Sequence, residues 1–317
     1  MSSTGGERAF VERLRKVLPA APAGQYWIGD DAAVLDDGLL LKTDVMVEGI
    51  HFDLSWCDPE DVGWKALAVN LSDIAAMGGA PTAAVVALVV PPNRPGMADR
   101  TMTGLANAAE RMGCPIVGGD TSSGPALTVA VAVLGHAPET GPVPRFGAQP
   151  GDIILVTGEL GAAASALASI RREGAMPVGL QRLRRPEPRL AEGAAAAEIG
   201  ATAMIDLSDG LATDLRHVCE ESGLGAVIDE GKLPLFRCAD LEMALFGGDD
   251  YELLFTIPPH RCDELPSWRG TPITRIGMMT NGPPQVTLRG ARGSRQLENR
   301  GFEHKIAAPT TSSGETR

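Results

Sequence analysis

Residues 58–79, DPEDVGWKALAVNLSDIAAMGG, contain the start, the body and the end of one helix. Asp58 is followed by Pro59 and two acidic residues, a combination that favours the first turn of an α-helix. Apolar side chains then recur at helical spacing, at Trp64, Leu67, Leu71 and Ile74. The glycines at 78–79 end the pattern, and the valine-rich stretch 82–90, TAAVVALVV, predicts a buried strand. A helix that leads directly into a strand is typical of α/β proteins.

The same alternation continues along the chain. A short first helix should present Phe10, Leu14, Val17 and Leu18 on one face, and further helices are expected at 97–112, 162–171, 188–199 and 211–222. Strands are expected at 39–47, 116–117, 127–134, 152–157, 204–207, 226–228 and 251–257, and a strand at 273–279 is expected to pair with 285–288. Because the return from 116 to 134 is antiparallel, we predict an α/β (α+β) fold with mixed sheets.

The chain length suits two domains. It has 317 residues, of which 44% are hydrophobic, enough for two cores. The stretch 136–150, HAPETGPVPRFGAQP, is rich in proline and glycine and predicts the boundary. We therefore expect an N-terminal domain at 1–148, a C-terminal domain at 149–307 and a disordered tail at 308–317.

Composition excludes several classes of partner. The net charge of −12 argues against nucleic acid and against an anionic membrane, since both would be repelled. No apolar run reaches the length of a membrane span, and the N-terminus lacks the apolar segment of a signal peptide. Five cysteines without a CxxC pair favour neither a disulfide framework nor a thiolate zinc site. We expect a cytoplasmic protein.

Four short stretches place acidic residues beside glycine: 29–31 (GDD), 118–120 (GGD), 206–210 (DLSDG) and 247–250 (GGDD). Two carboxylates about 4 Å apart repel by roughly 4 kcal/mol at an effective dielectric near 20. Converging acids would therefore need divalent cations. The chain has no GxxxxGK[ST] motif and no protein-kinase motif set, and only five of its 28 basic residues are lysines. If these acids bind a nucleotide, Mg²⁺ is the remaining means of holding its phosphates.

Each motif also has a structural interpretation. Acid–glycine pairs are common in turns, and Asp206 and Asp209 could cap the helix that starts at 211. His51, between two apolar residues, is typical of a structural histidine, and Arg145 of a solvated charge. The position of Asp73 favours a functional role, because a carboxylate in the middle of a helix, beside its apolar stripe, contributes little to the stability of that helix.

The ordered set of motifs resembles the thiamine-monophosphate kinase family over residues 25–305. The motifs are GDDAAVL (29–35), KTDVMVEGIHF (42–52), KALAVNLSDIAAMG (65–78), VGGDT (117–121), RFGAQPGD (145–152), IDLSDGL (205–211) and GGDDYELLF (247–255). The family is grouped with aminoimidazole ribonucleotide synthetase, selenophosphate synthetase and a hydrogenase maturation protein.

The resemblance implies the fold of that group and a homodimer formed through the N-terminal domain. It implies transfer of the ATP γ-phosphoryl group to thiamine monophosphate, in line and without a phosphoenzyme, with several Mg²⁺ ions. The metal ligands would be Asp30, Thr43, Asp44, Asp73, Asp120, Asp206 and Asp209, with Asp44, Asp120 and Asp209 essential for transfer. ATP would contact Gly119, Asp120, Arg145 and Ser208, and the thiamine side would contact His51, Asp249 and Phe302.

Three positions depart from the pattern of the family. Asp249 stands where many members have glutamate, Lys42 stands where a small hydroxyl residue is usual, and Phe302 has no polar group on its ring. A lysine ammonium at 42 could serve phosphate or displace one metal ion.

Alternatives within and outside the group remain. No cysteine precedes Cys57, which disfavours selenophosphate synthetase, and the C-terminal GETR disfavours the hydrogenase protein. Aminoimidazole ribonucleotide synthetase and a catalytically inactive nucleotide-binding regulatory protein stay as alternatives.

Overall fold

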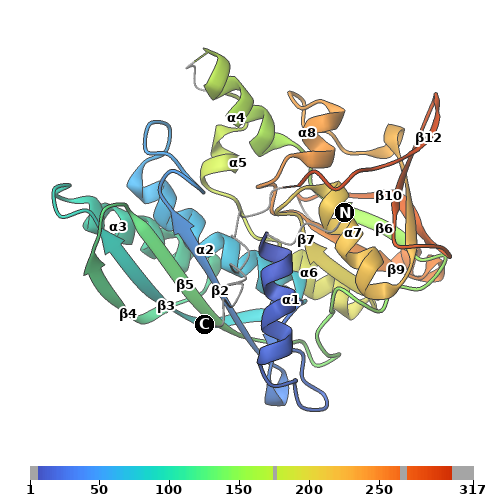
Figure 1. Ribbon diagram of the computed structural model, residues 1–317, viewed down its shortest axis with the longest axis horizontal. Helices are drawn as coiled ribbons and strands as arrows, with labels where there is room; N and C mark the ends of the chain where they lie inside the picture. Colours follow the sequence, from blue (N-terminus) through green and yellow to red (C-terminus); the bar gives the residue numbers. More distant parts are fainter. Residues whose placement is uncertain (1–5, 174–176, 265–269, 302–317) are drawn as a thin grey trace, which may run out of the picture.

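The computed structural model describes residues 6–173, 177–264 and 270–301, and it contains two mixed β-sheets (Figure 1). The N-terminal sheet has the strand order β1 (Ala33–Val34), β2 (Leu39–Val47), β5 (Thr128–His136), β3 (Ala80–Val90), β4 (Ile116–Ser123). The C-terminal sheet has the order β12 (Gly293–Gln296), β11 (Val286–Gly290), β8 (Gly225–Asp229), β10 (Ile273–Thr280), β6 (Ile153–Thr157), β9 (Leu253–Ile257), β7 (Ala203–Asp206). Both sheets combine parallel and antiparallel pairs, which confirms the prediction of a mixed α/β fold.

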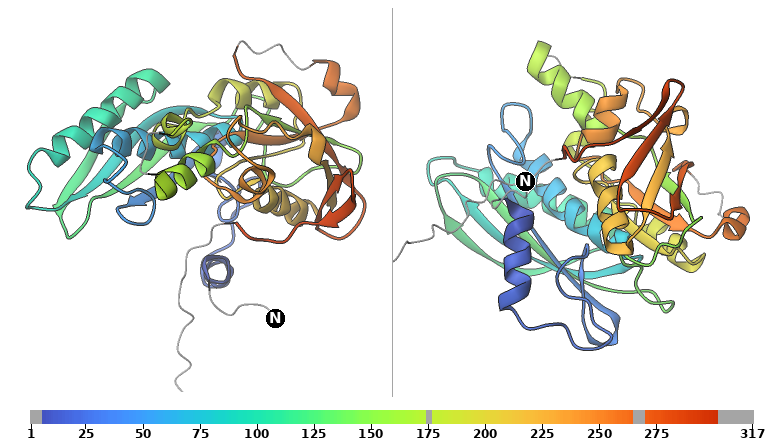
Figure 2. Two further views of the ribbon diagram at one scale, coloured as in Figure 1. Left: turned by 90° about the horizontal axis from the view of Figure 1, so that it is seen from above. Right: turned by 45° about the vertical axis from the view of Figure 1, so that its right-hand side comes forward.

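Eight α-helices accompany the sheets in the described part of the chain. They are α1 (Glu7–Val17), α2 (Pro59–Ala76), α3 (Met97–Met112), α4 (Ala162–Glu173), α5 (Leu180–Arg184), α6 (Leu190–Glu198), α7 (Leu211–Ser222) and α8 (Leu241–Phe246). Views from two further sides place the two sheets in opposite halves of the molecule (Figure 2). None of these helices is both long and apolar enough to cross a lipid bilayer.

The helix predicted from residues 58–79 is the central element. It begins as expected, with Asp58 as N-cap and the Asp61 carboxylate accepting a hydrogen bond from the Asp58 backbone N–H. Nearly all of its residues are buried, because α2 packs on the N-terminal sheet and on α3, and its last turn reaches α6 and β7. Ala75 and Ala76 lie in the same apolar cluster as Leu155, Met204 and Phe255 of the C-terminal half. One helix thus joins two cores.

The N-terminal sheet has one covered face and one open face. Along β5, Val129, Val131 and Val133 are fully buried under the helices. The opposite face carries exposed apolar side chains, among them Val45 and Val85.

Two predictions about the strands were wrong. Residues 273–279 do not pair with 285–288, because β8 lies between β10 and β11 and pairs with both. The strand predicted at 116–117 extends to Ser123, so Gly118–Asp120 lie in an edge strand and not in a turn. A central strand of alternating small and β-branched residues can accept partners on both edges, and local sequence does not say which strands these are.

Helices α2 and α3 touch at their backbones. A Cβ atom on Gly104 of α3 would collide with the carbonyl oxygen of Glu60, and one on Gly63 of α2 would collide with that of Thr101. The absence of side chains at these two positions sets how closely the helices approach.

We expect Gly104→Ala to lower the free energy of unfolding by about 1–3 kcal/mol, because the added methyl group forces the two helices apart. Denaturant titration followed by circular dichroism measures the change. Gly231→Ala is the matched control, since a Cβ there would meet open space. Equal stability of the two variants would contradict the close contact.

Candidate active site

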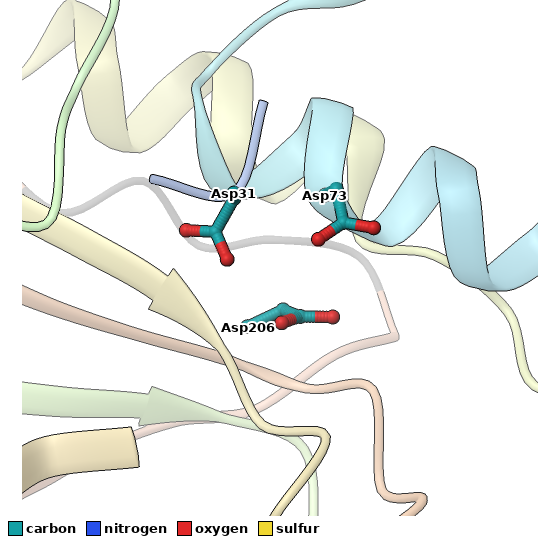
Figure 3. A group of neighbouring side chains, drawn as sticks. All are labelled: Asp31, Asp73 and Asp206. Atoms are coloured by element: carbon teal, nitrogen blue, oxygen red, sulfur yellow. The ribbon is translucent and has the colours of Figure 1, made fainter. Parts of the chain in front are cut away.

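Three carboxylates from distant parts of the chain meet where α2 passes between the two sheets. Asp31 comes from the loop before β1, Asp73 from α2 and Asp206 from the end of β7 (Figure 3). Each offers one oxygen that lies within 4.8 Å of the oxygens of the other two, and all three residues are buried. We call Asp31, Asp73 and Asp206 the acidic triad.

Two residues of α2 contribute to this region. Asp73 projects from the last turns of the helix, and its side chain is only 8% exposed. The neighbouring Ser72 hydroxyl donates a hydrogen bond of 2.6 Å to Asp206. The motif NLSD therefore places a carboxylate and a hydroxyl donor against the end of β7.

The helix-capping interpretation of Asp206 and Asp209 is wrong. Asp206 ends a strand, and the N-cap of α7 is Gly210. Asp214, inside α7, folds back to the residues just before the helix, and its carboxylate accepts hydrogen bonds from the backbone N–H groups of Asp209 and Gly210. Asp206 is therefore left to the triad.

Arg145 holds the two neighbouring acids at 30–31. Its guanidinium donates to Asp31 at 2.5 Å, and its backbone N–H donates to the Asp30 carboxylate at 3.2 Å. Asp30 also accepts from the Asp31 backbone N–H at 2.9 Å. The structure thus brings Asp31, which sequence reasoning missed, into the triad, with Asp30 beside it. The doubled aspartate at 30–31 marks this loop in the sequence, but it does not say which of the two acids enters the triad.

Strand β2 sends alternate side chains to opposite faces of its sheet. Lys42 and Asp44 lie on the face that α2 covers, and the Lys42 ammonium is 3.0 Å from Asp73 and 3.4 Å from Asp44. Thr43 lies on the other face, where its hydroxyl donates to the Val131 carbonyl at 2.9 Å. The structure does not bring Thr43 to the triad.

Gly119 and Asp120 also lie away from the triad. Both are exposed on β4, and β5 and β3 separate this strand from β2. Three strand spacings amount to about 14 Å, too far for one ion to bridge Asp44 and Asp120 of the same chain. The register places Asp120 in one row with Ala87, Ala130 and Val45, on the open face of the sheet.

The residues expected on the thiamine side have protein partners. The Asp249 carboxylate lies 3.0 Å from the buried Lys65 ammonium and accepts a hydrogen bond of 2.9 Å from the Tyr251 hydroxyl. The His51 Nδ1 accepts a hydrogen bond of 3.0 Å from the Val47 backbone N–H, as a structural histidine would. Phe302 lies outside the described residues, as does the predicted tail.

A cavity of about 330 Å³ opens beside the triad between α1 and α7. Its lining includes Arg145, Ser208 and Asp209, three of the residues that the resemblance assigned to ATP or metal. Thr213, His217 and Asn299 also line it and were not anticipated, since nothing in the local sequence marks them.

The charge balance of the site is negative. Burial, reinforced by the neighbouring Asp31, raises the pKa of Asp206 to about 7, and it raises the pKa of Asp30 to about 7 as well. Burial also raises the pKa of Asp73 well above its ordinary value, although Lys42 opposes the effect. Burial lowers the pKa of Lys42, but Asp73 and Asp44 outweigh it and hold that pKa above its ordinary value.

The donor set of the triad fits a hard divalent cation. Among the described residues no group donates a hydrogen bond to the buried Oδ2 of Asp31. Carboxylate oxygens are the ligands that Mg²⁺ prefers, and a cation beside them would offset both the burial and the mutual repulsion that raise their pKa values.

Comparisons with known proteins agree with this architecture. Residues 29–137 match the family model "AIR synthase related protein, N-terminal domain", and residues 149–288 match "AIR synthase related protein, C-terminal domain". The two halves of the chain are thus the N-terminal and C-terminal domains of an AIR synthase related protein.

Similar proteins identify the family within this group of AIR synthase related proteins. The thiamine-monophosphate kinase of Salmonella typhimurium is 39% identical over 86% of this chain and 88% of its own length, and that of Bacillus subtilis is 37% identical over 87% and 92%. A solved structure, "AaThiL complexed with AMPPCP and TMP", superposes with a TM-score of 0.83 at 34% identity and covers 94% of this chain and 97% of its own. The chain belongs to the thiamine-monophosphate kinase family.

We expect the stability of the metal-free protein to fall as the pH rises from about 4 to about 7. The Asp206 carboxyl keeps its proton in the folded protein up to about pH 7, whereas an unfolded aspartate ionises near pH 4, so folding becomes less favourable between these values. Mg²⁺ should raise Tm more at about pH 8 than at about pH 5, because protons compete for the same oxygens.

Thermal unfolding with EDTA and with Mg²⁺ measures both effects. Asp206→Asn should reduce the fall of Tm with rising pH, and it should abolish most of the rise in Tm that Mg²⁺ causes. Asp229→Asn is the control, because Asp229 also ends a strand but pairs with Arg289 and Lys232 outside the cleft. A Mg²⁺ effect that survives in Asp206→Asn would remove Asp206 from the metal site.

Proposed function

We propose that this chain transfers the γ-phosphoryl group of ATP to the phosphate of thiamine monophosphate, giving thiamine diphosphate and ADP. Relatives at 34–39% identity over most of their length support the reaction, and the complex of one relative with AMPPCP and TMP supports both substrates. The observation that carries the proposal in this chain is the convergence of Asp31, Asp73 and Asp206 beside a cavity lined by Arg145 and Ser208.

The acidic triad would hold Mg²⁺, with Asp30, Asp44 and Asp209 as further ligands of ions that arrive with ATP. Bound there, Mg²⁺ would neutralise the phosphates and hold them in line for transfer. The metal role of Asp30, Asp44 and Asp209 rests on the family resemblance together with their positions around the triad.

The remaining site residues would position the substrates. Arg145 and Ser208 would contact the phosphates of ATP from the cavity wall. The acceptor phosphate is itself the nucleophile, so transfer needs no side chain that becomes phosphorylated. On the thiamine side, Asp249 would act together with Lys65, and the loop that His51 stabilises and the segment of Phe302 would complete the pocket.

We further propose a homodimer formed through the open face of the N-terminal sheet. This face carries Leu41, Val45 and Val85, which are 44–47% exposed, and an apolar face of this kind is typical of a protein interface. A two-fold axis would place the same face of a second copy against it. Because Asp120 lies in the row of Val45 on this face, we propose that Gly119 and Asp120 serve the site of the partner subunit.

Incubation of the purified protein with ATP, Mg²⁺ and thiamine monophosphate tests the reaction. We expect thiamine diphosphate and ADP in equal amounts, and Asp206→Asn should lower kcat by at least about 100-fold, since even ligand-supporting residues typically cost 10–100-fold. Asp229→Asn should keep the activity. ATP binding without thiamine diphosphate would favour the regulatory alternative, and activity only with another phosphorylated acceptor would favour the ligase alternative.

Mixed dimers test the shared site. Asp120→Asn and Asp206→Asn subunits are each expected to be inactive, but their equimolar mixture, refolded together, should recover about a quarter of wild-type activity, because half of the dimers would carry one intact site of two. The recovery is measured in the same assay. If Asp120 served its own chain, both sites of every mixed dimer would be damaged and no activity would return.

A further inference from the structure

Lys42 is one of only five lysines in the chain, and it lies at the acidic cluster. Its side chain is 20% exposed, and its ammonium lies 3.0 Å from one oxygen of Asp73 and 3.4 Å from one oxygen of Asp44. The position follows from β2, whose alternation directs Lys42 and Asp44 to the face under α2, where Asp73 projects. A positive charge is therefore built between two carboxylates.

The two cations of the cluster differ in kind. Arg145 lies on the side of Asp30 and Asp31 and holds them with a guanidinium and a backbone N–H. Lys42 contacts Asp44 and Asp73 and presents a compact point charge, which of all side chains most resembles a bound metal ion. Asp73 is shared, since it belongs to the triad and also contacts Lys42.

The space between Asp44 and Asp73 needs a cation. Asp73 is 8% exposed and Asp44 is 40% exposed, so water screens Asp73 poorly. Other acids of the triad stand close to Asp73 as well. Without a positive group at this position, the carboxylates would repel each other across a partly buried gap.

We propose that, in the nucleotide-free protein, the Lys42 ammonium occupies the cation position between Asp44 and Asp73, so that this state binds one divalent ion fewer than its carboxylates would otherwise hold. The inference rests on the proposed magnesium-dependent function and deepens it. The ammonium is part of the chain and cannot be lost to solvent, so before ATP binds this part of the site stays neutralised whatever the Mg²⁺ concentration. In the nucleotide-free protein, ion exchange is therefore confined to the triad.

Removal of the ammonium should open the position. Lys42→Ser removes the ammonium from between two carboxylates and adds a hydroxyl oxygen. The two carboxylates and the hydroxyl are oxygen ligands of the kind that a hard divalent ion accepts. The full-length, nucleotide-free protein is titrated with Mn²⁺ in place of Mg²⁺, and free Mn²⁺ is followed by electron paramagnetic resonance. We expect Lys42→Ser to bind one Mn²⁺ more per chain than the wild type.

Two further variants complete the experiment. Lys232→Ser is the matched control and should bind the wild-type number, since Lys232 pairs with Asp229 at the surface. Asp44→Asn, with Lys42 intact, should also bind the wild-type number, because Asp44 faces the ammonium in the free protein. This variant decides the question if circular dichroism shows that Lys42→Ser does not fold.

The outcomes separate this inference from the kinase proposal. An equal number of ions in wild type and Lys42→Ser would overturn it, as would the loss of one ion in Asp44→Asn. One additional ion in Lys42→Ser would support it even if the wild type formed no thiamine diphosphate, because counting ions requires no turnover. If the wild type forms thiamine diphosphate but wild type and Lys42→Ser bind equal numbers of ions, the kinase proposal is supported and the role of Lys42 is contradicted.

Discussion

The repulsion between buried carboxylates is the constraint on which the site depends. Asp31, Asp73 and Asp206 arrive from a loop, a helix and a strand end, and each loses hydration on burial. The chain offsets part of this cost with Ser72, which donates to Asp206, with Arg145, which donates to Asp31, and with Lys42, which pairs with Asp73. It leaves the middle of the cluster uncompensated. An uncompensated centre with rigid walls is what gives a divalent cation its affinity.

The rigidity of these walls comes from α2. Its capping box, its close contact with α3 and its almost complete burial fix the rotation of the helix, and with it the direction of Asp73. The same helix carries Lys65, whose ammonium pairs with Asp249 of the C-terminal half of the chain. One element thus orients residues on the metal side and on the side proposed for thiamine.

Sequence reasoning succeeded where the signal was local and failed where it depended on pairing. The start of α2 follows from its capping residues, the bounds of α3 and α7 follow from apolar periodicity, and the structure reproduces them. The choice between Asp30 and Asp31 depends on which of the two side chains the loop before β1 turns toward the triad, and no spacing encodes this direction. The face of Thr43 and the distance of Asp120 depend on strand order, and the partners of β8 depend on contacts between segments far apart in sequence.

The position of α2 in both cores has a consequence for cooperativity. If the chain were divided near residue 148, the C-terminal part would lose Ala75 and Ala76 and would expose the apolar surface of Leu155, Met204 and Phe255 to water. The two halves, although each has its own sheet, should therefore melt in a single transition rather than one after the other. A fold with two sheets would then behave in solution as one unit, and neither fragment would be a usable tool for dissecting the enzyme.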